Sequence, residues 1–256
     1  MKLRLSRPAT NLLSANIDIT GSKSETNRLL LLRAFFENIE LKNISNSDDA
    51  EVMQKGLLIS EGEVDIHHAG TAMRFLTSYF AVSKGKKVVL TGSARMKQRP
   101  IKILVDALKS LGAEIEYIEN EGYPPLKIHG KKIVKPKVSL PANVSSQYIS
   151  SLILVAPSLE NGLSIELLGE ITSVPYIKMT LSLLHQIGAR TEFEGQLIRI
   201  EPLNVVKDKV LVVESDWSSA SYFYSLAALS DPGSEIKLAA YKKDSLQGDS
   251  ILADVY

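Results

Sequence analysis

The chain of 256 residues contains no cysteine, which excludes a disulfide framework, a thiolate metal site and a cysteine nucleophile. Aromatic residues make up only 6% of the sequence. No apolar run approaches the roughly 18 residues that a membrane-spanning helix needs. An excess of one charge is also lacking, because 30 Lys and Arg face 29 Asp and Glu, for a formal net charge of +1. Global electrostatic attraction to nucleic acid or to an anionic membrane is therefore excluded, and any basic site must be local.

Hydrophobic residues make up 45% of the chain, which is enough to form a core in one large domain or in two small ones. The segment Met1–Ile19 lacks the apolar stretch that is typical of a secretory signal peptide. The composition therefore predicts a soluble, cytoplasmic, globular protein.

One kind of unit recurs along the chain, in which a polar turn is followed by an apolar helix and a short strand. Its copies cover 22–41, 69–90, 143–167 and 215–238. A second kind of unit alternates with it, and consists of a helix, a Gly-Ala pair and an extended segment. In each of its two copies we expect a proline in the first helical turn, Pro100 or Pro175, and a glycine after the helix. Hairpin-like returns at 126–128 and 197–200 complete a repeated βαβαββ pattern, which indicates a mixed α/β (α+β) fold.

The first unit begins with several groups that suit an anion. Ser22 and Glu25 have the spacing of a capping box at a helix start. Ser24 and Arg28 share one face of that helix, and Lys23 lies at its mouth. A helix N-terminus adds free N–H donors and partial positive charge. Two interpretations stay open here: a phosphate or oxyanion site, and an ordinary capped helix with solvated charges.

Similar polar groups stand at the start of other helices. Ser145, Ser146 and Gln147 head one apolar helix, where they either bind a phosphate or polyol or simply cap the helix. The small residues of Ala69–Arg74 let backbone approach a ligand closely, although close helix packing would also explain them. The basic run Arg95–Arg99 either binds a carboxylate or phosphate or forms a solvated face.

Two adjacent histidines are candidates for metal ligands. His67 and His68 are expected to point to opposite faces of a strand, which is poor geometry for chelation. We therefore expect no metal site, although His68 is close enough to the Gly70 turn to reach a ligand.

Taken together and in order, nine motifs resemble the enolpyruvylshikimate-phosphate synthase family. They are Gly21–Arg28, Ala69–Arg74, Leu90–Gly92, Arg95–Pro100, Tyr123–Leu126, Val144–Gln147, Ser173–Ile177, Asp216–Ser221 and Gln247–Asp249. The resemblance runs from about Leu5 to the last residue. It implies transfer of the enolpyruvyl group of phosphoenolpyruvate to the 5-hydroxyl of shikimate 3-phosphate, with release of phosphate. This is a step of the shikimate pathway to aromatic amino acids, and it uses no metal or organic cofactor.

The resemblance also implies an architecture of two similar domains, each with three βαβαββ units around a pseudo-threefold axis, in an inside-out barrel. Residues 21–213 would form one complete domain, and 1–20 with 214–256 would form part of the second. The apolar helical pattern that begins at Ser250 stops at Tyr256, so we expect a truncated chain. The family's acid/base carboxylates and lysine would lie beyond Tyr256, which predicts that this polypeptide alone does not turn over. The family is usually monomeric and cytoplasmic, and binds neither nucleic acid nor membrane.

Substrate contacts follow from the same resemblance, residue by residue. The residues implied for shikimate 3-phosphate are Lys23, Ser24, Arg28, Ser145, Ser146, Gln147, Ser173 and Tyr176. Those implied for phosphoenolpyruvate are Lys23, His68, Gly70, Arg99 and Gln147. Lys23 would touch both substrates and is the catalytic residue that the resemblance places within this chain.

Two residues depart from the family pattern, which usually has Asn where this chain has His68 and often has Pro where it has Phe75. Both lie near the position at which glyphosate competes with phosphoenolpyruvate, and Gly70 leaves room for that inhibitor. One alternative function is the sister enolpyruvyl transferase that acts on UDP-N-acetylglucosamine. It normally has a reactive cysteine in the loop that corresponds to Gly92–Gln98, where this chain has none. A second alternative is a non-catalytic module that binds a phosphorylated ligand.

Overall fold

The computed structural model describes residues 12–172 and 174–256. Two successive units have the same topology. The first consists of β3 (Glu61–Asp65), α3 (Gly70–Val82), β4 (Lys87–Thr91), α4 (Lys102–Leu111), β5 (Glu114–Tyr117) and β6 (Leu126–His129). The second consists of β7 (Lys137–Pro141), α5 (Ser146–Val155), β8 (Leu163–Leu168), α6 (Val174–Gln186), β9 (Thr191–Glu194) and β10 (Leu197–Ile200). Their sheets have the orders β3-β4-β6-β5 and β7-β8-β10-β9, in which the first pair is parallel and the other pairs are antiparallel.

A third unit is assembled from segments far apart in the sequence. It consists of α1 (Lys23–Phe35), β2 (Ile39–Lys42), α2 (Asp48–Leu57) and β11 (Lys209–Val212). Strand β11 pairs in parallel with β2, with Lys209 opposite Ile39, and so takes the place that β3 and β7 have in their sheets. The third unit therefore repeats the βαβα part of the pattern with its first strand supplied by the later segment.

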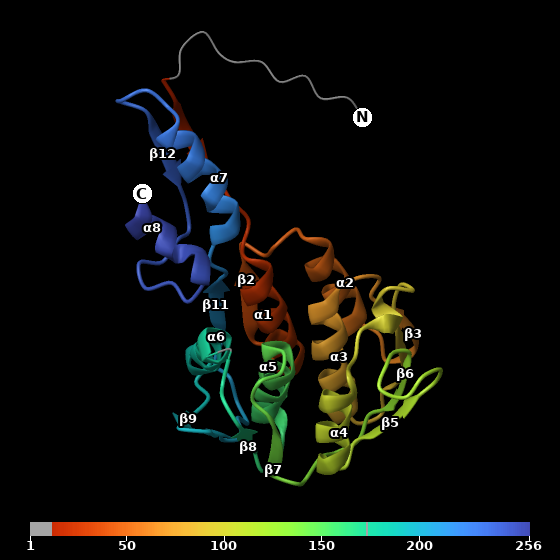
Figure 1. Cartoon of the computed structure of the whole chain (residues 1–256). Helices are drawn as coiled ribbons and strands as arrows, with labels where there is room; N and C mark the ends of the chain where they lie inside the picture. The colour runs from red at the N-terminus through yellow and green to blue at the C-terminus, as the bar shows by residue number, and fades with distance from the viewer. Residues whose placement is uncertain (1–11, 173) are drawn as a thin grey trace.

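A fourth group lies at one end of the molecule (Figure 1) and is called the small lobe here. It consists of β1 (Ser14–Ile17), α7 (Trp217–Ala228), β12 (Glu235–Leu238), the short 3₁₀ helix Gly248–Ile251 and α8 (Leu252–Val255). Strands β1 and β12 are parallel neighbours, so the small lobe again contains a βαβ arrangement. All four helix–strand repeats expected from the sequence are thus confirmed.

The core is built around three helices rather than around a sheet. Helices α1, α3 and α5 run side by side in the middle of the body, with β3–β6 on one flank and β7–β10 on the other (Figure 1). Every residue of α3 from Gly70 to Ala81 is buried, as are Leu29–Leu32 of α1 and Tyr148–Val155 of α5. A helix that is apolar on all sides is stable only when it is covered on all sides. The helices therefore lie inside and the sheets outside, which confirms the expected inside-out arrangement.

Two sequence interpretations need correction. Pro100 lies before α4 and not in its first turn, because the backbone is extended at Arg99 and the helix begins at Lys102. Pro175, by contrast, does lie in the first turn of α6. His67 and His68 are not on a strand, since β3 ends at Asp65 and His67 has a φ of 49° in the turn that follows. Gly112 follows α4 in the left-handed conformation that the sequence predicts.

Two chain segments, 20–22 and 214–216, join the small lobe to the body, and they pair in antiparallel fashion where they cross. Gly21 and Ser215 form a β-bridge, and the Ser22 N–H donates to the Glu214 carbonyl at 2.8 Å. The Asp216 N–H donates to the Thr20 carbonyl at 3.2 Å. The domain boundaries at Gly21 and Val213 stay a prediction. Within the described ranges, no helix is both long and apolar enough to cross a membrane.

The crossing predicts an intolerance of any side chain at Gly21. A Cβ there would lie 2.6 Å from Val213 Cγ1 and would also collide with the Asn43 carbonyl oxygen. Because a backbone carbonyl and a β-branched side chain cannot move aside cheaply, Gly21→Ala should lower the free energy of unfolding by about 2–3 kcal/mol. Gly248→Ala is the matched control, since a Cβ at Gly248 meets nothing within 4 Å. Equal urea midpoints for the two variants would contradict this packing.

Candidate functional site

The three central helices begin at the same end of the body. Arg28 in the second turn of α1 donates from Nη2 to Ser150 Oγ in the second turn of α5, at 3.0 Å. The Arg28 guanidinium also lies 5.5 Å from the ring of Phe75, in the second turn of α3. Gln147 Nε2 in the first turn of α5 donates to Thr71 Oγ1 in the first turn of α3, at 3.1 Å. The first turns of the three helices therefore surround one common region, which is called the helix-start site here.

The first turn of α1 is capped as the sequence predicts, but only in part. Ser22 Oγ accepts from the Glu25 N–H at 3.2 Å, which confirms the cap. The Glu25 side chain does not reach back to complete a capping box; it accepts from the Glu214 N–H at 3.2 Å instead. Lys23 is exposed, with its Nζ 3.9 Å from an Asp49 oxygen, and Ser24 is half-buried. The predicted cation and hydroxyl therefore lie at the mouth of α1, accessible to a ligand.

Arg28 is held rigidly inside the site. It is only 3% exposed, and its Nε donates to Thr180 Oγ1 at 2.8 Å while Nη1 donates to the Ser24 carbonyl at 2.7 Å. Burial lowers the pKa of Arg28 to about 10, so the guanidinium stays charged at neutral pH. A guanidinium has five N–H groups. One N–H on each terminal nitrogen has no bond to the described residues, so the charge is fixed in place and still has donors for a ligand.

The α5 side of the site is made of short polar side chains. Ser145 is the N-cap, and its Oγ accepts from the Gln147 N–H at 3.4 Å. Ser145 is exposed and Ser146 is half-buried, which leaves both hydroxyl groups accessible. Tyr176 on α6 is 46% exposed, and its ring centroid lies 5.8 Å from Arg28 Cζ. Ser173 lies outside the described residues, so its predicted role stays a prediction.

The α3 side opens into a pocket of about 650 Å³. Its lining consists of His68, Ser93, Ala94, Arg95, Met96 and Arg99. Arg99 lies over the start of α3, because a Cβ on Gly70 would come within 2.5 Å of Arg99 Nη1. His68 Nδ1 is 3.0 Å from Ser93 Oγ. This pocket therefore joins a helix N-terminus to two arginines, a combination that suits a phosphate or carboxylate.

The predicted basic run does not act as a unit. Arg95 and Arg99 line the pocket, whereas Lys97 forms an ion pair with Glu119 at 2.6 Å. Among the described residues, no group of three or more His, Asp or Glu side chains could hold a metal ion.

Sequence reasoning missed the residues that hold Arg28. Ser150 and Thr180 are fully buried inside otherwise apolar stretches of α5 and α6, and Thr180 Oγ1 also donates to Ser150 Oγ at 3.1 Å. Hydroxyl groups in a buried helix face need partners. One sequence signal could have indicated them: a hydroxyl residue stands within the apolar stretch of each of two helices, and an arginine follows the start of a third apolar helix.

This network predicts that the shape of the guanidinium, and not only its charge, is required at position 28. Arg28→Lys keeps the cation but loses at least one of the two hydroxyl partners, so the free energy of unfolding should fall by about 2–4 kcal/mol. Arg33→Lys, in the half-buried last turn of the same helix, should change it by no more than about 0.5 kcal/mol. Denaturant unfolding of the two variants measures both changes. An equal loss of unfolding free energy in the two would show that the guanidinium hydrogen bonds do not anchor Arg28.

The comparisons with known proteins agree with each other. The family model described as EPSP synthase (3-phosphoshikimate 1-carboxyvinyltransferase) matches residues 55–256. A 3-phosphoshikimate 1-carboxyvinyltransferase of Bacteroides fragilis is 45% identical over 258 residues, which cover 100% of this chain and 62% of the relative. One of Haemophilus influenzae is 38% identical over 272 residues, and the match covers 93% of this chain and 62% of the relative.

The fold is also that of a solved relative. The structure of EPSP synthase from Acinetobacter baumannii superposes with a TM-score of 0.77 at 21% identity, over 93% of this chain and 57% of that one. The chain thus spans about three fifths of the length of the curated relatives it matches. From the matched family model and the identity to these relatives, we conclude that the chain belongs to the EPSP synthase family.

Proposed function

We propose that the protein, at the full length of its relatives, transfers the enolpyruvyl group of phosphoenolpyruvate to the 5-hydroxyl of shikimate 3-phosphate. The observation that carries the proposal is the helix-start site, where three helix N-termini meet around a buried arginine. Both substrates carry several negative charges, and this site offers N–H donors, Lys23, Arg28 and Arg99 to meet them. The 256 residues would supply the binding groups and not the whole active site.

Shikimate 3-phosphate fits the side of the site formed by α1 and α5. Ser145 and Ser146 would donate to the 3-phosphate at the start of α5, where the helix dipole also favours an anion. Arg28 has, on each terminal nitrogen, one N–H without a partner among the described residues, and would hold the carboxylate together with Ser24. Tyr176 stands beside that guanidinium and would line the ring of the substrate. Ser173 joins this set by family resemblance alone.

Phosphoenolpyruvate fits the pocket at the start of α3. Arg99 and the backbone at Gly70 would bind its charged groups, with His68 donating from the rim. Gln147 bridges α5 to Thr71 of α3 and so stands between the two substrate positions. Lys23 at the mouth of α1 would touch both ligands. The reaction also needs an acid for the enol carbon and a base for the 5-hydroxyl, and the residues that line this pocket contribute no carboxylate.

Two alternatives are weighed against this proposal. The segment Gly92–Gln98 has no cysteine, and the relatives described above are named 3-phosphoshikimate 1-carboxyvinyltransferases, so UDP-N-acetylglucosamine is disfavoured as the acceptor. A non-catalytic module would bind the phosphorylated ligand alone and is separated by assay of the full-length protein. The same proposal makes the protein a cytoplasmic monomer whose partners are these small molecules.

Binding of shikimate 3-phosphate by the 256-residue chain tests the proposal directly. Calorimetry should detect binding, and Lys23→Ala or the double change Ser145→Ala/Ser146→Ala should weaken it about 10- to 100-fold, because each removes charge-assisted hydrogen bonds worth about 1.5–3 kcal/mol. Lys55→Ala is the control, since Lys55 is an exposed cation paired with Glu51 on α2.

The proposal would be contradicted if calorimetry detected no heat at millimolar shikimate 3-phosphate, or if Lys23→Ala bound it as tightly as the wild-type chain does. Tighter binding of UDP-N-acetylglucosamine than of shikimate 3-phosphate would favour the sister enzyme.

A further inference from the structure

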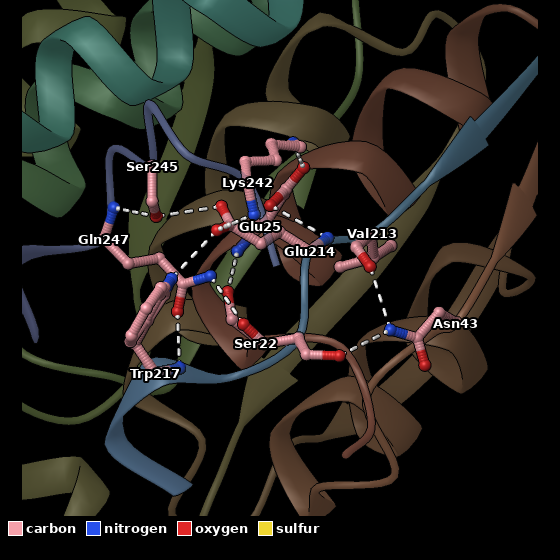
Figure 2. Close-up of polar contacts among 10 residues, drawn as sticks. Ser22, Glu25, Asn43, Val213, Glu214, Trp217, Lys242, Ser245 and Gln247 are labelled. Carbon is pink, nitrogen blue, oxygen red and sulfur yellow. Dashed lines mark hydrogen bonds and ion pairs between the residues drawn. The ribbon is translucent and has the colours of Figure 1, made fainter. Parts of the chain in front are cut away.

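A buried polar network occupies the joint between the body and the small lobe (Figure 2). The residues labelled in it are not among those proposed above to bind a substrate. The network contains two nearly inaccessible carboxylates, Glu25 at 4% exposure and Glu214 at 3%. Buried carboxylates are rare unless they are paired or hydrogen-bonded. Their position at the crossing of the two chain segments calls for an explanation.

Among the described residues, the side chain of Glu214 accepts hydrogen bonds only from the small-lobe side of the joint. Its Oε1 accepts from Trp217 Nε1 at 2.9 Å and from the Lys242 N–H at 3.0 Å. Its Oε2 accepts from Ser245 Oγ at 3.0 Å. These three donors come from the segment 217–245, so Glu214 folds the loop before the 3₁₀ helix back onto the crossing segment (Figure 2).

The Glu25 side chain connects the body to the small lobe. It lies in the first turn of α1, two residues after Lys23, and its Oε2 accepts from the Glu214 N–H at 3.2 Å. Its Oε1 accepts from Lys242 Nζ at 3.1 Å, in an ion pair whose lysine belongs to the loop that follows β12 (Figure 2). The Glu25 carboxylate therefore adds a side-chain tie between the turn that carries Lys23 and Ser24 and the small lobe.

The electrostatic balance of this joint costs stability. Burial raises the pKa of Glu25, and the nearby Glu214 raises it further, while Lys242 lowers it. A folded-state pKa above the ordinary value means that the folded chain binds the proton more tightly than the unfolded chain does. Stability therefore falls as pH rises from the ordinary pKa of Glu25 through its raised one, so ionisation of this group opposes folding. A charge that is retained against stability suggests a positional role.

We propose that Glu25 and Lys242 are a positioning pair, which sets the small lobe against the first turn of α1 and so fixes Lys23 and Ser24 for the phosphorylated ligand. The ligand part of this inference rests on the proposed function, whereas the positioning of the lobe does not. Neither residue touches the ligand: each acts through the placement of the turn.

Protonation of Glu25 is the natural release for this pair. The charged groups that face Glu25 are Lys242 and Glu214 from the joint, Arg28 from its own helix, and Asp244 across a cavity of about 280 Å³. When Glu25 takes up a proton, its ion pair with Lys242 is lost, while the Lys242 N–H still donates to Glu214 on the small-lobe side. The lobe should then be freer to move relative to α1 as the pH falls.

The lack of native cysteine allows a clean distance measurement on the 256-residue chain. Lys127→Cys on β6 and Lys237→Cys on β12, both exposed positions, carry a fluorescent donor and acceptor for energy transfer between the body and the small lobe. In this background we compare Glu25→Gln, Lys242→Met, their double variant and Lys242→Arg. Lys132→Met is the control, because it breaks an exposed ion pair with Glu160 far from the joint.

We expect Glu25→Gln and Lys242→Met to shift the transfer efficiency in the same direction, and the double variant to shift it no further. Lys242→Arg keeps the cation and should retain the transfer efficiency of the parent chain, and Lys132→Met should leave that efficiency unchanged. Wild-type protein should shift toward the Glu25→Gln value as the pH falls through the raised pKa of Glu25 toward its ordinary one, and Glu25→Gln should not respond. An unchanged efficiency in Glu25→Gln, additive shifts, or an equal pH response in that variant would overturn the proposal.

Ligand binding supplies a second and separate readout. Glu25→Gln should weaken shikimate 3-phosphate about tenfold at neutral pH, within the usual range for coupling between two sites, while its thermal midpoint stays at or above that of the wild type. Undiminished affinity in Glu25→Gln would overturn the positioning of Lys23 and Ser24. If the wild-type chain binds no shikimate 3-phosphate, the proposed function fails for these residues, and the distance measurement still decides whether the pair sets the lobe.

Discussion

Helices α1, α3 and α5 bury most of their residues against one another and against the surrounding sheets, and the common direction of their starts follows from this packing. Because the helices pack in a common direction and register, their second turns meet at Arg28, Ser150 and Phe75. Their first turns consequently open at one end of the body. Three helix N-termini in one place concentrate N–H donors and partial positive charge.

A buried guanidinium completes that arrangement. The hydrocarbon packing of three helices would by itself leave the site polar but uncharged. Arg28 adds a fixed charge, whose desolvation is offset by two hydroxyl groups, one carbonyl group and the faces of two aromatic rings. The joint with the small lobe uses the opposite charge in a similar way, since Glu25 is buried only where Lys242 and the Glu214 N–H can meet it. A charged side chain is thus buried in each of the first two turns of α1, Glu25 in the first and Arg28 in the second. Each has partners from distant segments.

Local pattern was sufficient for the elements and for the helix starts. The four helix–strand repeats, the caps at Ser22 and Ser145, and the glycine that ends α4 follow from spacing and from residue type, which act within a few residues. The extended backbone before α4 and the turn at His67 did not follow, because tertiary contacts decide them. The two hydroxyl partners of Arg28 and the partners of the Glu25 carboxylate lie more than 100 residues away, so no local rule could supply them. Family resemblance named the site residues, and the packing explains why most of those within the described ranges come together.

From this packing we infer that the starts of α1 and α5 form one anion site. An NMR titration of the 256-residue chain with shikimate 3-phosphate, followed at each backbone amide, tests it most directly. We expect the amides of Lys23–Glu25 and of Ser146–Tyr148 to shift together and to fit a single dissociation constant. Shifts confined to one of the two helix starts, separate dissociation constants for the two, or shifts confined to the small lobe would contradict it.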